Sequence, residues 1–416
     1  MAMLAKWFSF ILLLTALIGA EAQTIKAASC SQNDVSNAIN SASSGDTVTV
    51  PAGNCSWSGL SVAKAVTLQG AGVGQTNISL NGTTTFTKQS AGVMRITGFS
   101  FSVSGGGDAN KPLMINGSWL GAQPIVFANN SFNVSGSGLF RINVPGGVIF
   151  TQDKFTGGWD DSFLQIKDAS DSQGSWTHAD SLGNRDTNGT MNIYIEDSTF
   201  LGGSNQGIDC DDACRMVNRH NTFTNSESNS HGDDTSDYGM RHFEIYGNRF
   251  LNTRDSSQLA NENQAIWIRG GTGVIYNNYF DDLAGNYWGN KAEISMQIRT
   301  ASEPSQQGLS CSTLKYPIRR QIGQNYNGSN YFTDPVYVWS NTGTVGINPD
   351  FFGWGNSCGF SYSQFFASGR DYVFANPASG GNAKPGYTAY RYPHPLAGGS
   401  VSSGPNAPTG VQAVAR

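Results

Sequence analysis

The chain has 416 residues, a net charge of −5 and only 13% charged side chains, compared with about 25% in typical proteins. An acidic chain is not expected to bind nucleic acid, because nucleic-acid-binding surfaces are basic. Its 51 glycines and many Asn, Ser and Thr residues favour short strands joined by turns. A repeat architecture would place this length in a single domain.

The first 22 residues are typical of a secretory signal peptide. Lys6 supplies the positive charge, residues 8–18 are apolar, and Ala20-Glu21-Ala22 matches a cleavage motif. The apolar run is too short to span a bilayer comfortably, and no later segment resembles a membrane span. We therefore predict a secreted protein that is cleaved near Ala22 and has no membrane partner.

Six cysteines in an exported protein are expected to form disulfides. They fall in three sequence neighbourhoods: Cys30 with Cys55, Cys210 with Cys214, and Cys311 with Cys358. Pairing of nearest neighbours is one hypothesis among several connectivities. A zinc site is less favoured, because no pair has zinc-finger spacing with a matching His or Cys pair.

Residues 31–43 predict a helix near the N-terminus, with apolar residues at helical spacing and Ser31 or Asn33 as its cap. Short strands are predicted next at 47–50, 63–69 and 75–80. We expect this segment to cap the first coil of a stack of strands, whose edge would otherwise be exposed.

A phrase that closes with phenylalanine recurs along the central chain. The closing residues are Phe132, Phe155, Phe200, Phe223, Phe250 and Phe280, at intervals of 23 to 30 residues apart from one interval of 45. A period in this range indicates a solenoid, and a propeller would need longer repeats. The predicted strands of about five residues, without helices between them, exclude an α/β fold. They lie at 140–144, 163–167, 192–196, 215–219, 242–246, 265–269, 274–277 and 293–299.

Alignment of the coils on the closing phenylalanine separates inward from outward positions. Ile195, Ile245 and Ile275 stand five residues before it and are expected to face the core. Asn218 takes this place in one coil, which predicts an internal asparagine ladder. We expect each closing phenylalanine to stack on the next at roughly 4.8 Å.

The regular pattern fades after residue 300. Residues 311–358 predict a long loop with one strand at 336–339, 361–375 a short helix, and 385–395 an extended closing segment. Residues 397–416 are a Gly/Ser/Pro linker, and their end resembles the opening strand of a fibronectin type III domain. We therefore expect either a further C-terminal module or self-assembly.

These features resemble the right-handed parallel β-helix of the pectin-lyase-like superfamily. The phrases at 219–223, 243–246 and 268–275 resemble those of secreted bacterial β-helix repeat proteins of unsettled function. The resemblance implies an all-β, single-stranded right-handed parallel β-helix over residues 23–396, with a helical N-terminal cap and a loop-rich closing segment. The superfamily contains polysaccharide lyases, glycoside hydrolases, esterases, tailspikes and adhesins, so the fold leaves the reaction open.

Basic residues occupy alternate positions of several predicted strands, namely Arg141, Lys167, Arg269 and Arg299. On one sheet they would form a cationic stripe suited to the carboxylates of a uronate polymer, with Lys167, Trp267 and Arg299 binding substrate. A flat tryptophan ring can stack on a sugar. The alternatives are unrelated solvated charges and a tryptophan packed in the core.

Acidic residues cluster at Asp209, Asp211 and Asp212, beside Cys210 and Cys214. Carboxylate oxygens suit Ca²⁺, so these three residues are candidate calcium ligands. A solvated acidic turn is the alternative.

His231 follows in a polar loop, close in sequence to Arg241. A histidine beside carboxylates can act as a general acid or base. Asp211-Asp212, His231-Gly232 and Arg269 also occur in the order found in polygalacturonase-type hydrolases. That likeness is incomplete, because Gly270-Gly271 follows Arg269 and no earlier Asn-Thr-Asp is present.

The sequence favours a secreted lyase that cleaves an acidic, uronate-containing glycan by β-elimination, with His231, Arg241 and Arg269 as catalytic residues. The first alternative is a non-catalytic glycan-binding or structural β-helix protein. A polygalacturonase-like hydrolase is the second alternative.

Overall fold

The computed structural model of the chain describes the following residues: 21–87, 92–104, 111–117, 124–136, 138–144, 146–158, 162–167, 189–202, 206–232, 239–254, 264–282, 293–298, 310–318, 320–327, 329–344, 346–350, 358–375 and 383–398. Most of the predicted signal peptide, Arg299 and most of the predicted linker lie outside them.

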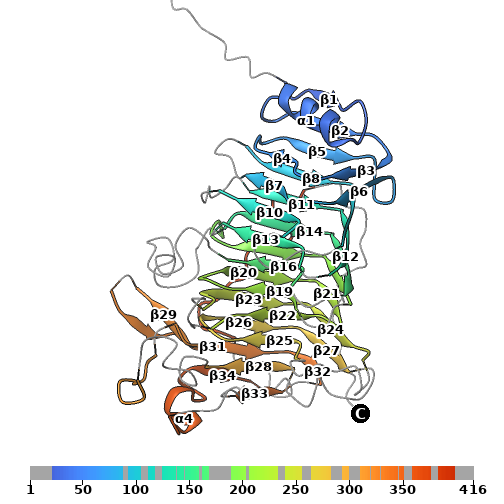
Figure 1. Cartoon of the computed structure of the whole chain (residues 1–416). Helices are drawn as coiled ribbons and strands as arrows, with labels where there is room; N and C mark the ends of the chain where they lie inside the picture. The colour runs from blue at the N-terminus through green and yellow to red at the C-terminus, as the bar shows by residue number, and fades with distance from the viewer. Residues whose placement is uncertain are drawn as a thin grey trace, which may run out of the picture.

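The chain winds into coils that each add one strand to three parallel sheets, and the coils stack along one axis (Figure 1). Sheet A contains β1 (Thr24–Lys26), β2 (Thr47–Val50), β5 (Thr67–Gly70), β8 (Met94–Thr97), β11 (Ile125–Ala128), β14 (Val148–Thr151), β17 (Ile193–Glu196), β20 (Arg215–Arg219), β23 (His242–Tyr246), β26 (Thr272–Tyr276), β31 (Val336–Trp339) and β34 (Tyr372–Phe374). Sheet B contains β3 (Gly53–Trp57), β6 (Thr76–Leu80), β9 (Ser100–Ser104), β12 (Ser131–Ser135), β15 (Lys154–Gly158), β18 (Thr199–Leu201), β21 (Thr222–Thr224), β24 (Arg249–Asn252), β27 (Tyr279–Asp282) and β32 (Thr342–Gly343). Sheet C contains β4 (Ser61–Val62), β7 (Thr84–Thr87), β10 (Leu113–Asn116), β13 (Phe140–Asn143), β16 (Leu164–Ile166), β19 (Gln206–Cys210), β22 (Glu227–Ser230), β25 (Ile266–Ile268), β28 (Ile294–Gln297) and β33 (Ile347–Asp350).

This architecture confirms the predicted all-β, right-handed parallel β-helix. Helix α1 (Gln32–Ser41) covers its N-terminal end, and the Ser31 side chain accepts a hydrogen bond from the Asp34 N–H at 3.3 Å, as a cap should. One prediction near this end is only partly right: residues 67–69 belong to β5, whereas residues 63–66 connect it to β4 of another sheet. The chain turns between them to close the coil.

The closing segment is largely irregular. It contains a short helix, α4 (Tyr362–Phe365), and an antiparallel hairpin made of β29 (Gln324–Tyr326) and β30 (Tyr331–Thr333). The hairpin projects beside the stack (Figure 1). No helix among the described residues is long and apolar enough to cross a membrane.

A column of phenylalanine rings fills the core beneath sheet B. Its members are Phe101, Phe132, Phe155, Phe200, Phe223, Phe250 and Phe280, and neighbouring ring centroids lie 4.6 to 5.4 Å apart with nearly parallel planes. The rings stack because the parallel register places equivalent residues of adjacent coils one strand spacing apart. The predicted stacking of the closing phenylalanines is confirmed.

A second column, of asparagines, occupies the tight turn between sheets A and B. The N–H of Asn221 donates to Oδ1 of Asn248 at 2.9 Å, and the N–H of Asn248 donates to Oδ1 of Asn278 at 3.1 Å. Asn218 joins this ladder, because its Oδ1 accepts from Nδ2 of Asn221 at 2.7 Å. His220, with φ of 57°, is the left-handed residue of one such turn, so its place is architectural.

Three disulfides join Cys30 to Cys55, Cys210 to Cys214 and Cys311 to Cys358. The predicted nearest-neighbour pairing is therefore confirmed. Disulfides persist in oxidising compartments, so they indicate an extracellular protein.

Candidate functional site

The polar side chains of interest gather at the ends of four successive strands of sheet C. The register pairs Ile166 of β16 with Cys210 of β19, and Cys210 with Ser230 of β22. The residues that follow these strands and β25 therefore stand above one another along the coil axis. They are Lys167, Asp211, His231 and Arg269, and we call them the Lys167–Arg269 row.

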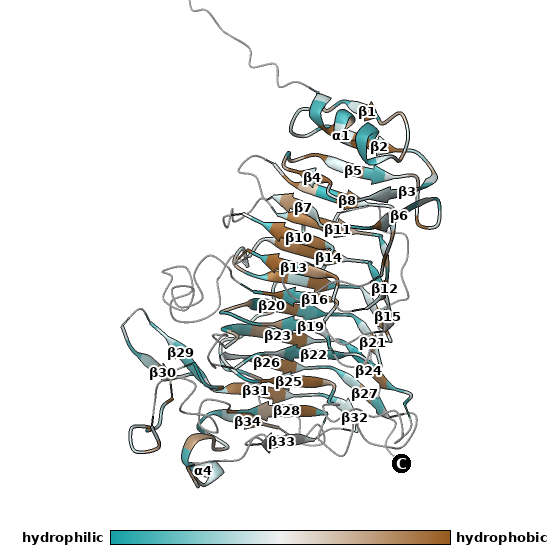
Figure 2. Ribbon diagram, in the orientation of Figure 1, coloured by the Kyte–Doolittle hydropathy of each residue, from teal (hydrophilic) through white to brown (hydrophobic). Residues whose placement is uncertain are grey.

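A second row lies two residues earlier on the same face of sheet C. Register places Arg141, Gln165, Asp209, Asn229 and Trp267 in line. Two of the predicted basic residues, Lys167 and Arg269, thus share one row, and Arg141 lies in the adjacent one. Strand β22 is hydrophilic along its length, whereas β10 is largely hydrophobic (Figure 2). The outer face of sheet C is therefore more polar near β22 than near β10.

Two aspartates hold the imidazole of His231. Its Nδ1 lies 3.1 Å from Oδ1 of Asp209 and also contacts Oδ1 of Asp211. The other oxygen of Asp211, Oδ2, lies 3.5 Å from Nζ of Lys167. The His231 side chain is 22% exposed and that of Lys167 15%, whereas both carboxyl groups are buried. Solvent therefore meets the cations and not the carboxylates.

Burial and neighbouring charges determine which side chains of this cluster are protonated. Burial and the charge of Asp209 raise the pKa of Asp211 to about 7. Burial would also raise the pKa of Asp209, but His231 and Arg269 outweigh it and hold this pKa well below its usual range. Burial and Arg269 would lower the pKa of His231, and the two aspartates instead raise it to about 10. At neutral pH His231 is therefore an imidazolium.

Arg269 is fixed by the neighbouring strand. Its Nε donates to the main-chain oxygen of Ser230, and its Nη2 donates to Oδ1 of Asn229 at 3.3 Å. The guanidinium lies 4.1 Å from the ring centre of Trp267, a favourable cation–π arrangement. The expectation that Trp267 offers an open face to a sugar is not met here, because its side chain is buried and Arg269 lies over its ring.

Two predicted site residues lie apart from the row. The Nη2 of Arg241 donates to the main-chain oxygen of Tyr326 at 3.1 Å, in the projecting hairpin. Burial and the nearby charge of Arg215 lower the pKa of Arg241 to about 9. Asp212 lies in the turn closed by the Cys210–Cys214 disulfide, with φ of 37°. Arg299 lies outside the described residues.

Among the described residues, the atoms grouped closely enough to bind one metal ion belong to Asp209, Asp211 and His231, and they lie within 4.8 Å of one another. This set differs from the predicted calcium ligands, because a histidine nitrogen takes the place of Asp212. Calcium prefers oxygen ligands alone, and a mixed set of imidazole and carboxylate suits transition metals better. The cations Lys167 and Arg269 on either side also disfavour a dication.

The sequence reading missed Asn229 and Ser230, which position Arg269. A signal for them was present, because β22 consists of Glu-Ser-Asn-Ser and is buried along its whole length. Buried polar strands are uncommon, since each polar group needs a hydrogen-bond partner. A buried polar strand among apolar strands therefore indicates a network of polar side chains.

Comparisons with known proteins extend to the fold alone. Neither a protein family nor a curated protein sequence matches the chain. Among solved structures, the catalytic domain of a GH87 α-1,3-glucanase variant in complex with tetrasaccharides has a TM-score of 0.29 and 12% identity, and covers 85% of this chain and 67% of its own. The family 28 exopolygalacturonase of Yersinia enterocolitica has a TM-score of 0.27 and 9% identity, with coverage of 79% and 78%.

Proposed function

We propose that this protein binds an acidic polysaccharide along the outer face of sheet C and cleaves it by β-elimination. The observation that carries the proposal is the Lys167–Arg269 row, in which three of four positions are cationic and the one carboxylate is buried. A polymer with a carboxylate on each sugar would meet Lys167 and His231 in succession, and the buried Arg269 adds positive charge next to them in the row. The protein as a whole is acidic, so this local excess of positive charge is specific to the face.

β-Elimination requires two kinds of group from the protein, a base and a cation. A base removes the proton next to the uronate carboxylate while a cation neutralises that carboxylate; the bond to the leaving oxygen then breaks and a double bond forms between the two ring carbons. Lys167 and Arg269 supply the neutralising charge. The neutral imidazole of His231 removes the proton, and the imidazolium so formed then donates a proton to the leaving oxygen. Below pH 10 His231 is already a cation and cannot act as the base. We therefore expect an alkaline optimum.

Hydrolysis is the second candidate, and it is favoured by a specific observation. Asp209 and Asp211 have pKa values displaced in opposite directions, as in an acid–base pair of glycoside hydrolases. Both carboxyl groups are buried, however, and a glycosidic oxygen would have to reach them. The accessible groups are Lys167 and His231, both cations, so elimination ranks first.

One experiment separates the candidates. The protein is incubated with pectate, alginate and glucuronan, and both the ultraviolet absorbance of unsaturated products and the release of reducing ends are followed. Elimination raises both signals, and hydrolysis raises reducing ends alone. Co-sedimentation with a polymer while neither signal rises would identify a binding protein and overturn the catalytic proposal. Parallel reactions with Ca²⁺ and with EDTA test whether the reaction uses calcium.

Two histidine variants provide the matched comparison. His231→Gln removes the titrating group and is expected to reduce the rate by about 100-fold or more. His242→Gln changes a half-buried histidine at the start of β23 in sheet A, and is expected to leave the rate nearly unchanged. Equal activities of the two variants would remove His231 from the proposed mechanism.

A further inference from the structure

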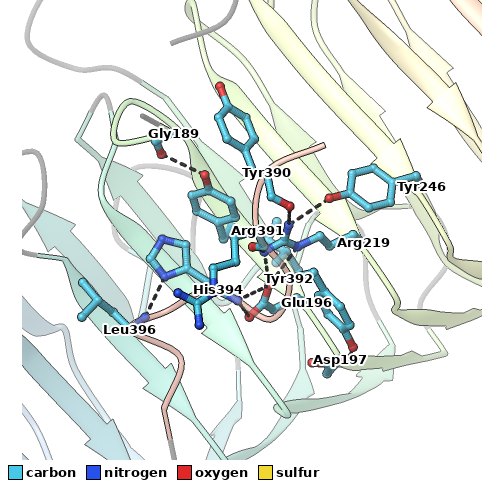
Figure 3. Close-up of polar contacts among 12 residues, drawn as sticks. Gly189, Glu196, Asp197, Arg219, Tyr246, Tyr390, Arg391, Tyr392, His394 and Leu396 are labelled. Carbon is cyan, nitrogen blue, oxygen red and sulfur yellow. Dashed lines mark hydrogen bonds and ion pairs between the residues drawn. The ribbon is translucent and has the colours of Figure 1, made fainter. Parts of the chain in front are cut away.

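The C-terminal segment, residues 383–398, lies against the outer face of sheet A and runs back along the coil axis. Tyr387 donates its hydroxyl to Oε2 of Glu244 at 2.7 Å, and the N–H of His394 donates to Oε1 of Glu196 at 3.0 Å. Near its end, the main-chain oxygen of Leu396 accepts from Nη2 of Arg95 at 2.8 Å. Figure 3 shows residues 390–396 around Arg219 and Glu196.

A cavity of about 230 Å³ lies between this segment and sheet A. Its walls are apolar and aromatic, with Ile149 and Tyr194 from the sheet and Tyr390 and Leu396 from the segment. The rings of Tyr194 and Tyr390 meet at 75°, with centroids 6.1 Å apart. The volume is below the roughly 300–1,000 Å³ of pockets for drug-sized ligands, so the cavity suits one small ring and not a chain.

Three polar groups of the lining are suited to a ligand. Oδ1 of Asn192 is buried and accepts no hydrogen bond from the described residues. Nδ1 of His394 accepts from the N–H of Leu396 at 3.1 Å, and burial together with Arg219 lowers the pKa of His394 to about 4. The imidazole is therefore neutral with its proton on Nε2, which makes that atom a donor. Arg391, which is exposed, supplies the one charge among the lining residues.

We propose that this cavity is a non-catalytic binding site for a single uronate ring, such as the end of an acidic glycan. A sugar ring would present its C–H face to Tyr390, a contact that aromatic side chains favour, because Tyr194 is buried against Arg219 and His394. A ring hydroxyl would donate to Oδ1 of Asn192, and a ring oxygen would accept from Nε2 of His394. Arg391 would bind the carboxylate, for which a guanidinium is well suited. The site lies on a different sheet from the Lys167–Arg269 row and involves no bond cleavage.

Occupation of the cavity would also hold the C-terminal segment in place, because that segment supplies Tyr390, Arg391, His394 and Leu396 to its wall. A ligand that binds only the docked arrangement stabilises it by mass action. Sugar binding and docking of the segment would therefore strengthen each other, so protection of the segment is a second readout beside the binding signal.

The test uses the full chain with glucuronate, galacturonate and glucose as probes, each titrated to millimolar concentrations by calorimetry and by saturation-transfer NMR. We expect a uronate to bind, and to slow amide hydrogen exchange in residues 387–396. Arg391→Gln, at an exposed position, should weaken uronate binding by about tenfold. Asn192→Leu should abolish binding of every probe, since it removes the buried acceptor and fills the space. Thermal unfolding of both variants reports whether they are folded.

His231→Gln is the control that separates this site from the Lys167–Arg269 row. It should leave monosaccharide binding unchanged even where it abolishes cleavage of the polymer. The proposal is overturned if no probe binds, or if a uronate binds equally well to the wild type and to folded Arg391→Gln and Asn192→Leu. Loss of binding in His231→Gln alone would assign the sugar to sheet C and would also overturn it.

Discussion

Arg219 and Glu196 form an ion pair between neighbouring coils of sheet A, with Nη2 of Arg219 2.7 Å from Oε2 of Glu196 and neither side chain exposed. Arg219 also donates to the hydroxyl of Tyr246 and to the main-chain oxygens of Tyr390 and Arg391. One guanidinium thus joins three successive coils of the β-helix to the C-terminal segment (Figure 3). Its hydrogen bonds are among the contacts that hold this distant part of the sequence on the sheet.

Replacement of this arginine is expected to be costly. Arg219→Met leaves Glu196 buried without its partner, and removal of one member of a buried pair costs about 3–5 kcal/mol. The free energy of unfolding, measured with denaturant, should fall by that amount, and hydrogen exchange should accelerate in residues 387–396. Arg249→Met, which changes an exposed arginine on sheet B, is the control and should change stability by less than about 0.5 kcal/mol. Equal losses of unfolding free energy in the two variants would show that the buried ion pair stabilises the fold no more than an exposed arginine does.

The phenylalanine column predicts a second large effect. Phe223 is buried between Phe200 and Phe250, with ring centroids at 4.6 and 4.7 Å. Phe223→Ala opens a cavity in the middle of the stack and should lower the free energy of unfolding by about 3–5 kcal/mol. Leu201→Ala, at a residue 42% exposed on the outer face of sheet B, is the matched control. A small loss at Phe223 would mean that the coils repack around the gap.

The asparagine ladder predicts a smaller loss. Asn248 accepts from the N–H of Asn221, and its Nδ2 donates to the main-chain oxygen of Asn218 at 2.9 Å. Asn248→Ala leaves these buried groups without partners, at a cost of about 1–3 kcal/mol. Asn133→Ala, at an exposed position of β12, removes an amide without uncovering any buried group. Equal stability of the two variants would be inconsistent with a structural role for the ladder.

The sequence predicted those parts of the fold that depend on local repetition. Period-two alternation fixes which side of a strand faces inward, so Ile195 and Ile245 were placed correctly, and the closing phenylalanines had to stack once the coils were parallel. The register between the strands of sheet C was harder to predict, because loops of unequal length separate these strands in the sequence. The sequence offered Lys167, Asp211, His231 and Arg269 as candidates but could not show that they share one row.

Other contacts left no local signal in the sequence. The docking of residues 383–398 depends on side chains such as Arg219, which precedes Tyr390 by 171 positions, and an extended segment with prolines does not reveal its partner. Arg241 is near His231 in sequence, yet its side chain turns toward the hairpin at Tyr326. His231 follows a strand of sheet C, whereas Arg241 precedes a strand of sheet A, so their closeness in sequence did not place them in one site.

The charge on His231 predicts how stability changes with pH. Its pKa is raised from 6.5 to about 10 in the folded protein, because the attraction of Asp209 and Asp211 outweighs burial. The raised pKa contributes stability that is fully present below pH 6.5 and is lost as the pH rises through 10. Asp211 has a pKa raised to about 7, so its cost to stability grows from pH 4 to 7 and is constant above. Between pH 7 and 10 only the histidine contribution changes within this cluster.

The wild type should therefore lose stability between pH 7 and 10, with a slope of up to about 1.4 kcal/mol per pH unit. His231→Gln should lack this slope when the free energy of unfolding is measured across the same range. His220→Asn is the control, because Asn tolerates the left-handed turn and burial lowers the pKa of His220 to about 4. That residue is neutral in both folded and unfolded chains above pH 7.5, so its variant should retain the wild-type slope. Parallel profiles for the wild type and His231→Gln would show that His231 is not held as an imidazolium, and the proposed pH dependence of elimination would then lose its basis.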